Sequence, residues 1–324
     1  MQEMKFSLSL PPRLPINETV KLAIKADKAP FEAVWYGELY YNYSATVMLS
    51  TIAIKTDQVK MGLFTNPYHI NPALTSSIGC SLTEISSSRF LLGLGGGDIP
   101  TLLSIGIPST KLINSTRESI IIIRTLAKGE TISYSGKIFQ PMKARLRYDA
   151  LPFPIFIGGQ GPNMMRLSLD LADGFLLNSS SLHDVEFFYK LRRNHSRKDV
   201  EIIPYVLFEI SSTPSKLLLM VIARVVAGAS FQTLKRLNID LSLVSDIKDY
   251  IFQGKTSKAV KLINLDILDE FAIVGTIEQC IERIEAFRRY GVKEMVLAGT
   301  LDPQNFNDGL EKIIKQLLPS FQNR

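Results

Sequence analysis

A glycine-rich segment, LGLGGGD (92–98), ends in a carboxylic acid directly after a short apolar run. It does not match the dinucleotide fingerprint G-x-G-x-x-G, because the template that starts at Gly93 requires glycine where the chain has Asp98. Glycines at a strand end let a flat ligand approach the backbone, and Gly95 and Gly97 are candidate positions for this. Asp98 is then a candidate catalytic carboxylate beside that ligand. The alternative is a tight turn in which Asp98 caps the segment that follows.

A second glycine-rich segment, GGQGPN, follows an apolar run and precedes a helical pattern. Backbone N–H groups at the beginning of a helix, when glycines precede it, form a site that binds phosphate. No lysine follows at the position that nucleoside triphosphatases require, so that class is not indicated. A plain tight turn is the alternative. The segment predicts phosphate contacts by Gly158, Gly159, Gln160, Gly161, Pro162 and Asn163.

The loop TNPYHINP (65–72) follows another apolar run and combines two asparagines, two prolines and a histidine. Threonine and asparagine side chains donate and accept hydrogen bonds, as the edge of a heterocycle requires. Thr65 and Asn66 are therefore candidate ligand contacts. His69 is a candidate proton donor, although a single loop histidine more often lies at the surface or behind a site.

Other chemistries lack the residues that they need. The histidines His69, His183 and His195 show no H-x-x-x-H spacing and no C-x-x-C is present, so we expect no metal site. The nucleophile motif G-x-S-x-G is also missing. The two cysteines, Cys80 and Cys280, are too few for a disulfide scaffold, and we expect both to be buried in helices.

The composition indicates a globular protein. Of the 324 residues, 46% are apolar and 21% are charged, which excludes a disordered chain. The longest apolar stretch, 217–229, contains Arg224 and is shorter than the ~18 residues that a membrane span needs. The N-terminal residues do not resemble a signal peptide, so we expect a cytoplasmic protein. The net charge of +6 comes from dispersed basic residues, so no nucleic-acid partner is indicated, and the densest cluster, 192–198, is interpreted as a solvated helix end.

Short β-branched apolar runs alternate with helical patterns along most of the chain, which predicts βαβ units and a parallel sheet. We expect strands at 4–10, 32–36, 58–64, 89–95, 154–158, 174–178, 201–211 and 293–299, with a further apolar run at 271–276. We expect helices at 17–28, 44–54, 72–87, 115–127, 163–172, 277–290 and 307–318. A further helix follows the strand at 174–178 and ends at 193, and the region 216–268 is expected to be helical but irregular. This rhythm favours an α/β fold, a single (β/α)8 TIM-barrel domain (1–324) with insertions near 129–152 and 216–270. In such a barrel the active site lies at the carboxyl ends of the strands.

Four segments together resemble the luciferase-like superfamily of flavin- and deazaflavin-dependent oxidoreductases, and within it the methylenetetrahydromethanopterin reductase branch. The segments are EAVWYGE (32–38), the stretch from TNPYHINP to LGLGGGD (65–98), IGGQGPNMMRLSLDLADGFLLN (157–178) and FAIVGTIEQCIERIEAFRRYGVKEMVLAG (271–299). The resemblance implies a barrel that holds coenzyme F420, a deazaflavin, or alternatively FMN, and that acts on a small-molecule substrate.

The resemblance also implies how the cofactor is held. A non-proline cis peptide bond near Leu63–Phe64 would form a bulge behind the cofactor ring, at a cost of roughly 3–4 kcal/mol. Thr65 and Asn66 would contact the ring edge or the polyol, and residues 159–163 would hold the phosphate end. Further candidate cofactor contacts at strand ends are Gly95, Gly97, Gly158 and Asn178.

Two positions depart from the family pattern. After the second-strand tryptophan the family has an aspartate and often a histidine, whereas this chain has Glu38 and Leu39. Glu38 is therefore a second candidate catalytic carboxylate. At the end of strand one, the reductase branch has a glutamate that resembles a proton donor, and this chain has Ser9. A related enzyme with a substrate other than methylenetetrahydromethanopterin is therefore an alternative.

The resemblance implies hydride transfer from the reduced cofactor, with Asp98 or Glu38 moving a proton or stabilising charge. An FMN-dependent monooxygenase and a barrel that binds flavin without catalysis are the alternatives.

The helical segments 44–54 and 72–86 are apolar or small around much of their circumference, and the family forms dimers through this region. We therefore expect a homodimer.

Overall fold

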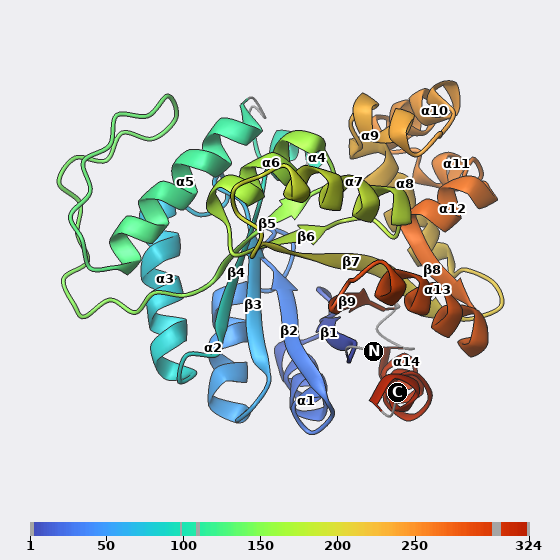
Figure 1. Cartoon of the computed structure of the whole chain (residues 1–324), viewed down its shortest axis with the longest axis horizontal. Helices are drawn as coiled ribbons and strands as arrows, with labels where there is room; N and C mark the ends of the chain where they lie inside the picture. The colour runs from blue at the N-terminus through green and yellow to red at the C-terminus, as the bar shows by residue number, and fades with distance from the viewer. Residues whose placement is uncertain (1–2, 98, 108–110, 300–305, 323–324) are drawn as a thin grey trace.

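The computed structural model describes residues 3–97, 99–107, 111–299 and 306–322, so the candidate Asp98 lies outside the described residues. Within these ranges, eight parallel strands close into a barrel that helices surround (Figure 1), which confirms the predicted fold. The strands of the ring are β1 (Lys5–Ser9), β2 (Phe31–Gly37), β3 (Lys60–Thr65), β4 (Phe90–Gly95), β5 (Ile155–Gly159), β6 (Gly174–Leu177), β7 (Glu201–Ile210) and β9 (Glu294–Ala298). Strands β1 to β6 pair in chain order, β7 pairs with β6 and β9, and β9 closes the ring against β1.

Strand β7 is long enough to contact three neighbours. Its first residues pair with β6, Tyr205 to Leu207 pair with β9, and Leu207 to Ile210 pair with the short strand β8 (Ala272–Gly275). The apolar run at 271–276 is therefore a strand beside the end of β7 and not a member of the closed ring. This arrangement places the middle of β7 close to β1, because β9 alone separates them.

Helices cover the outside of the barrel between successive strands (Figure 1). They are α1 (Ile16–Asp27), α2 (Ala45–Lys55), α3 (Pro72–Ile85), α4 (Ile99–Ser104), α5 (Leu112–Ala127), α6 (Pro162–Leu171), α7 (Leu182–Arg193), α13 (Ile277–Arg289), α14 (Phe306–Lys312), the π-helical turn η1 (Ile313–Leu317) and α15 (Pro319–Gln322). Apart from α4 and α15, these helices begin and end within a few residues of the expected positions. Helix α4 had no counterpart in the sequence prediction, because six residues that include a proline show no amphipathic repeat.

The first insertion, residues 129–152, extends away from the barrel as a long loop near α5 (Figure 1). It contains an isolated antiparallel bridge between Ile132 and Ala144. Glu118 of α5 is 5% exposed, and its carboxylate accepts the backbone N–H groups of residues 137–139 at 2.8–2.9 Å. This buried carboxylate anchors the turn of the loop to the barrel.

The second insertion builds a separate helical layer at the end of β7. Residues 216–271, all of them described, form α8 (Lys216–Gly228), α9 (Phe231–Arg236), α10 (Leu241–Phe252), α11 (Thr256–Val260) and α12 (Leu265–Phe271). Their apolar side chains form one cluster that includes Leu207 of β7 and Ala298 of β9. The insertion therefore packs directly on the barrel wall.

Apolar side chains pack on both sides of the barrel wall. Met61 and Leu63 of β3 belong to the large cluster between the strands and the surrounding helices. Trp35 of β2 belongs to a smaller cluster inside the barrel, against which Phe64 and Tyr205 pack. Gly62 leaves the space for this indole, because a Cβ at that position would lie 2.1 Å from it.

The expected cis peptide bond at Leu63–Phe64 is wrong, because the described residues contain no cis peptide bond. Strand β3 continues through this point, and Phe64 pairs with Gly37 on one side and Gly93 on the other. The Phe64 carbonyl also accepts the N–H of Glu38 at 2.8 Å. An extended chain thus satisfies both neighbouring strands without a bulge.

Candidate active site at the mouth of the barrel

Two aromatic rings form the floor of the barrel mouth. Phe64 lies near the end of β3 and Tyr205 in the middle of β7, with ring centroids 6.3 Å apart. Both side chains are partly exposed, whereas Trp35 in the interior cluster is 1% exposed. The carboxyl half of the barrel therefore presents an aromatic surface to a ligand.

Glycines in two strands leave space for the Phe64 ring. A Cβ would lie 2.6 Å from this ring at Gly93, 2.5 Å at Gly158 and 3.2 Å at Gly95. From the sequence we expect a flat ligand to occupy the space beside these glycines, whereas in the structure the Phe64 side chain occupies it. A ligand in the mouth therefore meets Phe64 before it meets Gly95 or Gly158.

Two hydroxyl groups meet at the edge of this floor. Tyr205 Oη donates to Ser9 Oγ at 2.5 Å, although 196 residues separate them in the chain. Burial raises the pKa of Tyr205 to about 12, and the hydrogen bond with Ser9 opposes part of this shift. The phenol is therefore neutral at pH 7. Sequence reasoning missed Tyr205, because an aromatic residue in an apolar strand is typical of a core.

Glu38 directly follows β2 and is partly buried. Its Oε2 accepts the backbone N–H of Ala45, the first residue of α2, at 2.9 Å. Burial raises the pKa of Glu38, while the hydrogen bonds from α2 and the nearby His69 oppose the shift. Glu38 thus lies at the mouth, but its carboxylate also holds the beginning of α2.

The loop after β3 is organised by Asn66, which is 4% exposed. Its Oδ1 accepts the backbone N–H groups of Tyr68 and His69 at 3.0 and 3.1 Å. His69 Nδ1 lies 3.0 Å from the carbonyl oxygen of Glu38 and 3.1 Å from Nδ2 of Asn66. The other ring nitrogen of His69, Nε2, is buried and has no hydrogen-bond partner among the described residues.

Leu63 and Thr65 lie on the opposite side of β3 from Phe64, because successive residues of a strand alternate. Leu63 is fully buried in the cluster between the barrel and the helices, so its side chain does not face the mouth. Thr65 is 2% exposed, and its hydroxyl has no partner in the described part of the chain. The structure therefore does not bring these two side chains together with Phe64.

The segment 158–163 joins β5 to α6, as the sequence predicts. Gly161 is the N-cap of α6 and Pro162 occupies its first turn, where backbone N–H groups have no helical partner. Gln160 Nε2 donates to the carbonyl of Asn178 at 2.7 Å and so connects the ends of β5 and β6. The residues of this rim that are partly or fully exposed are Gly159, Gln160, Gly161, Asn163 and Asn178.

An arginine from the second insertion reaches this rim. Arg236 of α9 forms an ion pair with the buried Asp184 at 2.5 Å and donates to the carbonyl of Gln160 at 3.2 Å. Its guanidinium also lies 4.6 Å from the centre of the Phe187 ring. A cation therefore lies beside the beginning of α6, whose dipole also attracts anions. Sequence reasoning missed Arg236, because 76 residues and an irregular insertion separate it from Gln160.

Gly97 lies in the turn between β4 and α4. Its φ of +95° favours glycine, and a Cβ there would lie 2.8 Å from Leu102 and 3.3 Å from Asn66. This glycine therefore permits the turn, and its role as a ligand contact stays a prediction. The catalytic role of Asp98 also stays a prediction, because that residue lies outside the described ranges.

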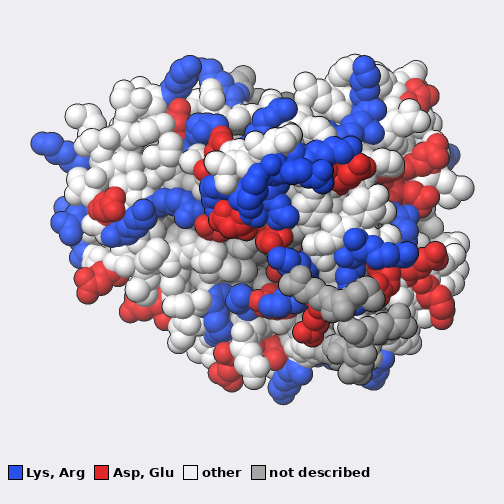
Figure 2. Space-filling view, in the orientation of Figure 1, with Lys and Arg blue, Asp and Glu red and all other residues white. Residues whose placement is uncertain are grey.

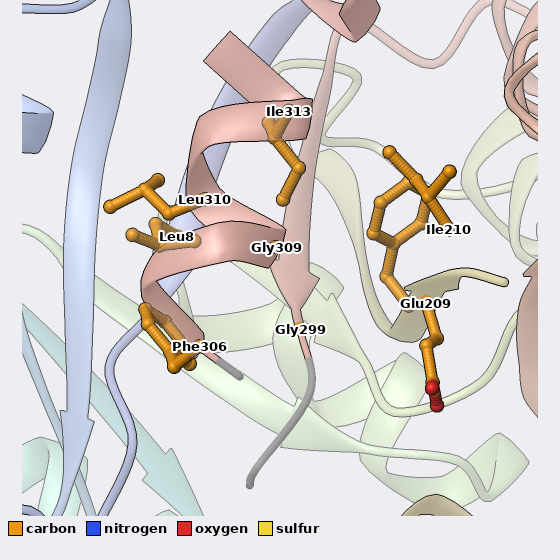
Figure 3. A pocket seen from close by; sticks show the side chains of 9 residues that line it. Leu8, Glu209, Ile210, Gly299, Phe306, Gly309, Leu310 and Ile313 are labelled. Atoms are coloured by element: carbon orange, nitrogen blue, oxygen red, sulfur yellow. The ribbon is translucent and has the colours of Figure 1, made fainter. Parts of the chain in front are cut away.

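A small cavity lies outside the barrel wall, between β1, β7 and α14 (Figure 3). Leu8, Phe306 and Leu310 line it, and the carboxylate of Glu209 points away from it. Its volume of about 20 Å³ suits roughly one water molecule, so it does not hold a tricyclic ring. This cavity is therefore separate from the candidate site at the mouth of the barrel.

Basic and acidic side chains lie next to one another on the face shown in Figure 2. At the end of α7, Arg192 pairs with Glu201 at 3.2 Å and Arg197 with Asp199 at 2.7 Å, which confirms the predicted helix end.

Cys80 and Cys280 are buried in α3 and α13, as expected. In the ranges that the structure describes, no helix is long and apolar enough to cross a membrane, and no group of three or more His, Cys, Asp or Glu side chains is placed to hold a metal ion.

The residues of the mouth fit a flat cofactor that carries an anion. Phe64 and Tyr205 offer apolar ring surface, and the buried Nε2 of His69 lacks a polar partner among the described residues. Arg236 and the first turn of α6 offer positive charge and N–H donors at the rim. The two aromatic rings, Arg236 and the beginning of α6 thus belong to the same end of the barrel.

The chain is similar to known proteins along nearly its whole length. The chain is 31% identical to 5,10-methylenetetrahydromethanopterin reductase of Archaeoglobus fulgidus, over 98% of this chain and 100% of that protein. It is also 31% identical to the protein of the same name from Methanolobus tindarius, over 96% of this chain and 98% of that one. The structure of coenzyme F420 dependent tetrahydromethanopterin reductase from Methanopyrus kandleri matches with a TM-score of 0.84 at 25% identity, and covers 99% of this chain and 100% of that one.

A family model described as luciferase-like monooxygenase matches residues 4–294. The match covers strands β1 to β8, the first residue of β9 and both insertions, so it includes every residue placed at the mouth above. The resemblance found in the sequence is thereby confirmed, and the chain belongs to the luciferase-like monooxygenase family.

Proposed function

We propose that this protein transfers a hydride between coenzyme F420 and a small-molecule substrate at the mouth of the barrel. The observation that carries the proposal is the aromatic floor of Phe64 and Tyr205, together with the cationic rim at Arg236 and α6. When bound, a deazaflavin supplies a flat ring that carries the hydride and a tail with phosphate. The name of the relative from Methanopyrus kandleri, which includes coenzyme F420, supports the choice of cofactor.

In this proposal the residues of the chain bind and orient more than they react. Phe64 supports one face of the cofactor ring, and the N–H groups of α6 and Arg236 bind the phosphate. Glu38 and Asp98 stabilise charge near the ring. We expect Asp98→Asn to lower turnover while cofactor affinity stays near normal, and unchanged turnover would remove Asp98 from the site.

The substrate that we propose is methylenetetrahydromethanopterin or a related pterin, because two relatives at 31% identity carry that name. A different substrate is the alternative, because Ser9 stands where the reductase branch has a glutamate. Anaerobic mixing of the reduced holoenzyme with methylenetetrahydromethanopterin tests this directly: we expect oxidation of the deazaflavin within one turnover. No oxidation would leave the deazaflavin proposal standing and reject the pterin.

The phosphate site is tested by a paired variant, Arg236→Gln with Asp184→Asn, which removes both charges so that no buried carboxylate is left alone. We expect the Kd for coenzyme F420 to rise at least tenfold, while the Kd for the deazaflavin riboside without phosphate stays within twofold. Arg192→Gln, at the end of α7, is the control that leaves both values unchanged. Equal losses for both ligands would contradict an anion site at Arg236.

A second candidate function is an FMN-dependent monooxygenase, which the description of the matching family model favours. Reduced FMN reacts readily with oxygen, whereas a reduced deazaflavin reacts sluggishly, so the cofactor decides between the two. Insertion of an oxygen atom into an organic substrate by the protein with reduced FMN would favour the monooxygenase. Cofactor binding without turnover of any electron acceptor would instead indicate a non-catalytic barrel.

We also propose that the chain is one domain and works as a cytoplasmic homodimer through α2 and α3. Apolar side chains on these helices are exposed: Val47 by 52%, Ile54 by 73%, Leu74 by 56% and Ile85 by 46%. Exposed apolar side chains gathered in this way favour association. Light scattering at micromolar concentration should give twice the chain mass of 36.2 kDa, and Ile54→Glu should halve it. A monomer before mutation would contradict the dimer.

A further inference from the structure

We propose that Ser9 and Tyr205 form a proton-donating pair at the floor of the mouth, in which Ser9 donates to a heteroatom of the substrate and Tyr205 replaces that proton. The inference rests on the proposed hydride transfer. A carbon that gains a hydride gives up one bonding electron pair to the heteroatom beside it, and that heteroatom then needs a proton. The described mouth offers this hydroxyl pair in a position to supply it.

The hydrogen bond between the two residues leaves one proton available. Tyr205 Oη donates to Ser9 Oγ at 2.5 Å, so the oxygen of Ser9 already accepts a hydrogen bond. A serine hydroxyl accepts and donates at the same time, and accepting from a phenol strengthens the donor. Among the described residues, the Ser9 side chain makes no other hydrogen bond, so its own proton is free for a ligand.

The pair lies at the carboxyl ends of the strands. Ser9, the last residue of β1, is 8% exposed, and Tyr205 is partly exposed beside Phe64. A substrate stacked over this floor therefore contacts the hydroxyl pair and the aromatic surface together. The carboxylate of Glu38, in contrast, already accepts a hydrogen bond from the beginning of α2.

A bound reduced deazaflavin would supply a hydride, that is two electrons and one proton, and would be oxidised as a C–H bond forms on the substrate carbon. The electron pair that this carbon shared with nitrogen or oxygen moves to that heteroatom. The O–H bond of Ser9 breaks, its proton joins the heteroatom, and Ser9 takes the proton of Tyr205. Water then protonates the phenolate of Tyr205, and the pair is restored.

Three variants test the pair: Ser9→Ala, Tyr205→Phe and both together. Each removes a hydroxyl and keeps the packing volume nearly constant. In the holoenzyme with methylenetetrahydromethanopterin, we expect each single variant to lower kcat at least 30-fold with KM changed less than threefold. Because the two hydroxyls act in one relay, the double variant should lose no more than about threefold beyond either single variant. Additive losses, or kcat within threefold of the parent, would overturn the relay.

Tyr189→Phe is the matched control. Burial raises the pKa of Tyr189 to about 12 as well, but this phenol lies in α7, next to Gly291, which precedes the amino end of β9. Its hydroxyl has no hydrogen-bond partner among the described residues. We expect this variant to keep kcat and KM within twofold of the parent.

A measurement on the protein without cofactor tests the pair independently of turnover. With tyrosine labelled by ¹³C at Cζ, the resonance that Tyr205→Phe removes should shift in Ser9→Ala and stay in place in Tyr189→Phe. An unshifted resonance would overturn the pair. If the parent binds coenzyme F420 but both variants turn over normally, this inference fails and the proposed function stands. If the parent binds no deazaflavin at all, the proposed function fails and this inference with it.

Discussion

Ser7 and Ser9 lie two residues apart on the same face of β1, yet their hydroxyl groups make different hydrogen bonds at the two ends of the barrel. Ser7 donates its proton to the carboxylate of Glu294 at 2.6 Å, near the amino ends of the strands. Ser9, at the mouth, accepts from Tyr205 and keeps its own proton. One strand therefore contributes a satisfied hydroxyl to one end and an available hydroxyl to the other.

The surroundings repeat this difference. At the amino end, Glu32 accepts from Lys5 at 2.9 Å and from Lys60 at 2.5 Å. At the mouth, His69 Nε2 is buried with no partner in the described part of the chain. Buried polar groups normally find partners, so this nitrogen at the mouth is a candidate contact for a ligand. The amino end of this barrel thus serves stability, and the mouth serves binding.

Arg89 offers the strongest test of this division. Its guanidinium, at the amino end, donates to the carbonyl oxygens of Ala53, Thr56, Val59 and Ser86 at 2.7–3.0 Å. Arg89→Met should lower the free energy of unfolding by about 3 kcal/mol, since several buried carbonyls lose a charged donor. Urea denaturation measures this loss. The Kd for coenzyme F420 should stay within twofold, and a much weaker affinity in the folded variant would contradict the division.

Gly158→Ala acts on the mouth. The new Cβ would lie 2.5 Å from the Phe64 ring, so the ring must move. We expect a loss of about 1–3 kcal/mol in stability and a roughly tenfold rise in the Kd for coenzyme F420. Gly228→Ala is the control, because no atom lies within 4 Å of its Cβ position, and we expect neither value to change appreciably. Unchanged affinity in Gly158→Ala would remove Phe64 from the cofactor site.

Glu294→Gln tests the amino end through pH. Burial raises the pKa of Glu294, and the hydrogen bond from Ser7 opposes part of that shift. Between the ordinary glutamate pKa and the raised pKa of Glu294, the unfolded chain has lost this proton while the folded chain keeps it. The free energy of unfolding of the parent therefore falls as the pH rises through this range. Thermal melting from pH 4 to 7 should show a smaller decline in the variant, which has no proton to lose. Parallel declines would show that Glu294 is not the source.

Lys5→Ala should have the smallest effect. Lys5 is 54% exposed, and Glu32 keeps its second partner, Lys60. Exposed ion pairs contribute about 0.2–1 kcal/mol, so we expect a loss near the lower limit. A loss above 2 kcal/mol in urea denaturation would indicate a coupled ionic network at the amino end.

The sequence predicts the barrel well because its strands carry local signals. Strands β3 and β4 are short apolar runs between turn residues, and their observed bounds differ from the expected ones by no more than two residues. Helix α4 has no such signal and was missed. The cis bond expected at Leu63–Phe64 came from the family resemblance, and the pairing of β3 with both neighbours replaces it with regular strand.

The site divides in the same way. The segment 158–163 was predicted from a local pattern, because glycines after an apolar run mark a strand end, whereas Glu38 came from the family resemblance. Tyr205 was not found, because only the closure of β7, β9 and β1 brings it to Ser9. Arg236 reaches Gln160 through the packing of α9, which no local pattern encodes. Contacts between distant segments need the closed barrel to become visible.

The central claim is that the barrel mouth binds a deazaflavin. Fluorescence titration of the protein without cofactor, with coenzyme F420 and with FMN in parallel, tests it most directly. We predict saturable binding of coenzyme F420 with a Kd at least tenfold below that for FMN, and weaker binding in Gly158→Ala. Failure to bind either molecule, or tighter binding of FMN, would contradict the account.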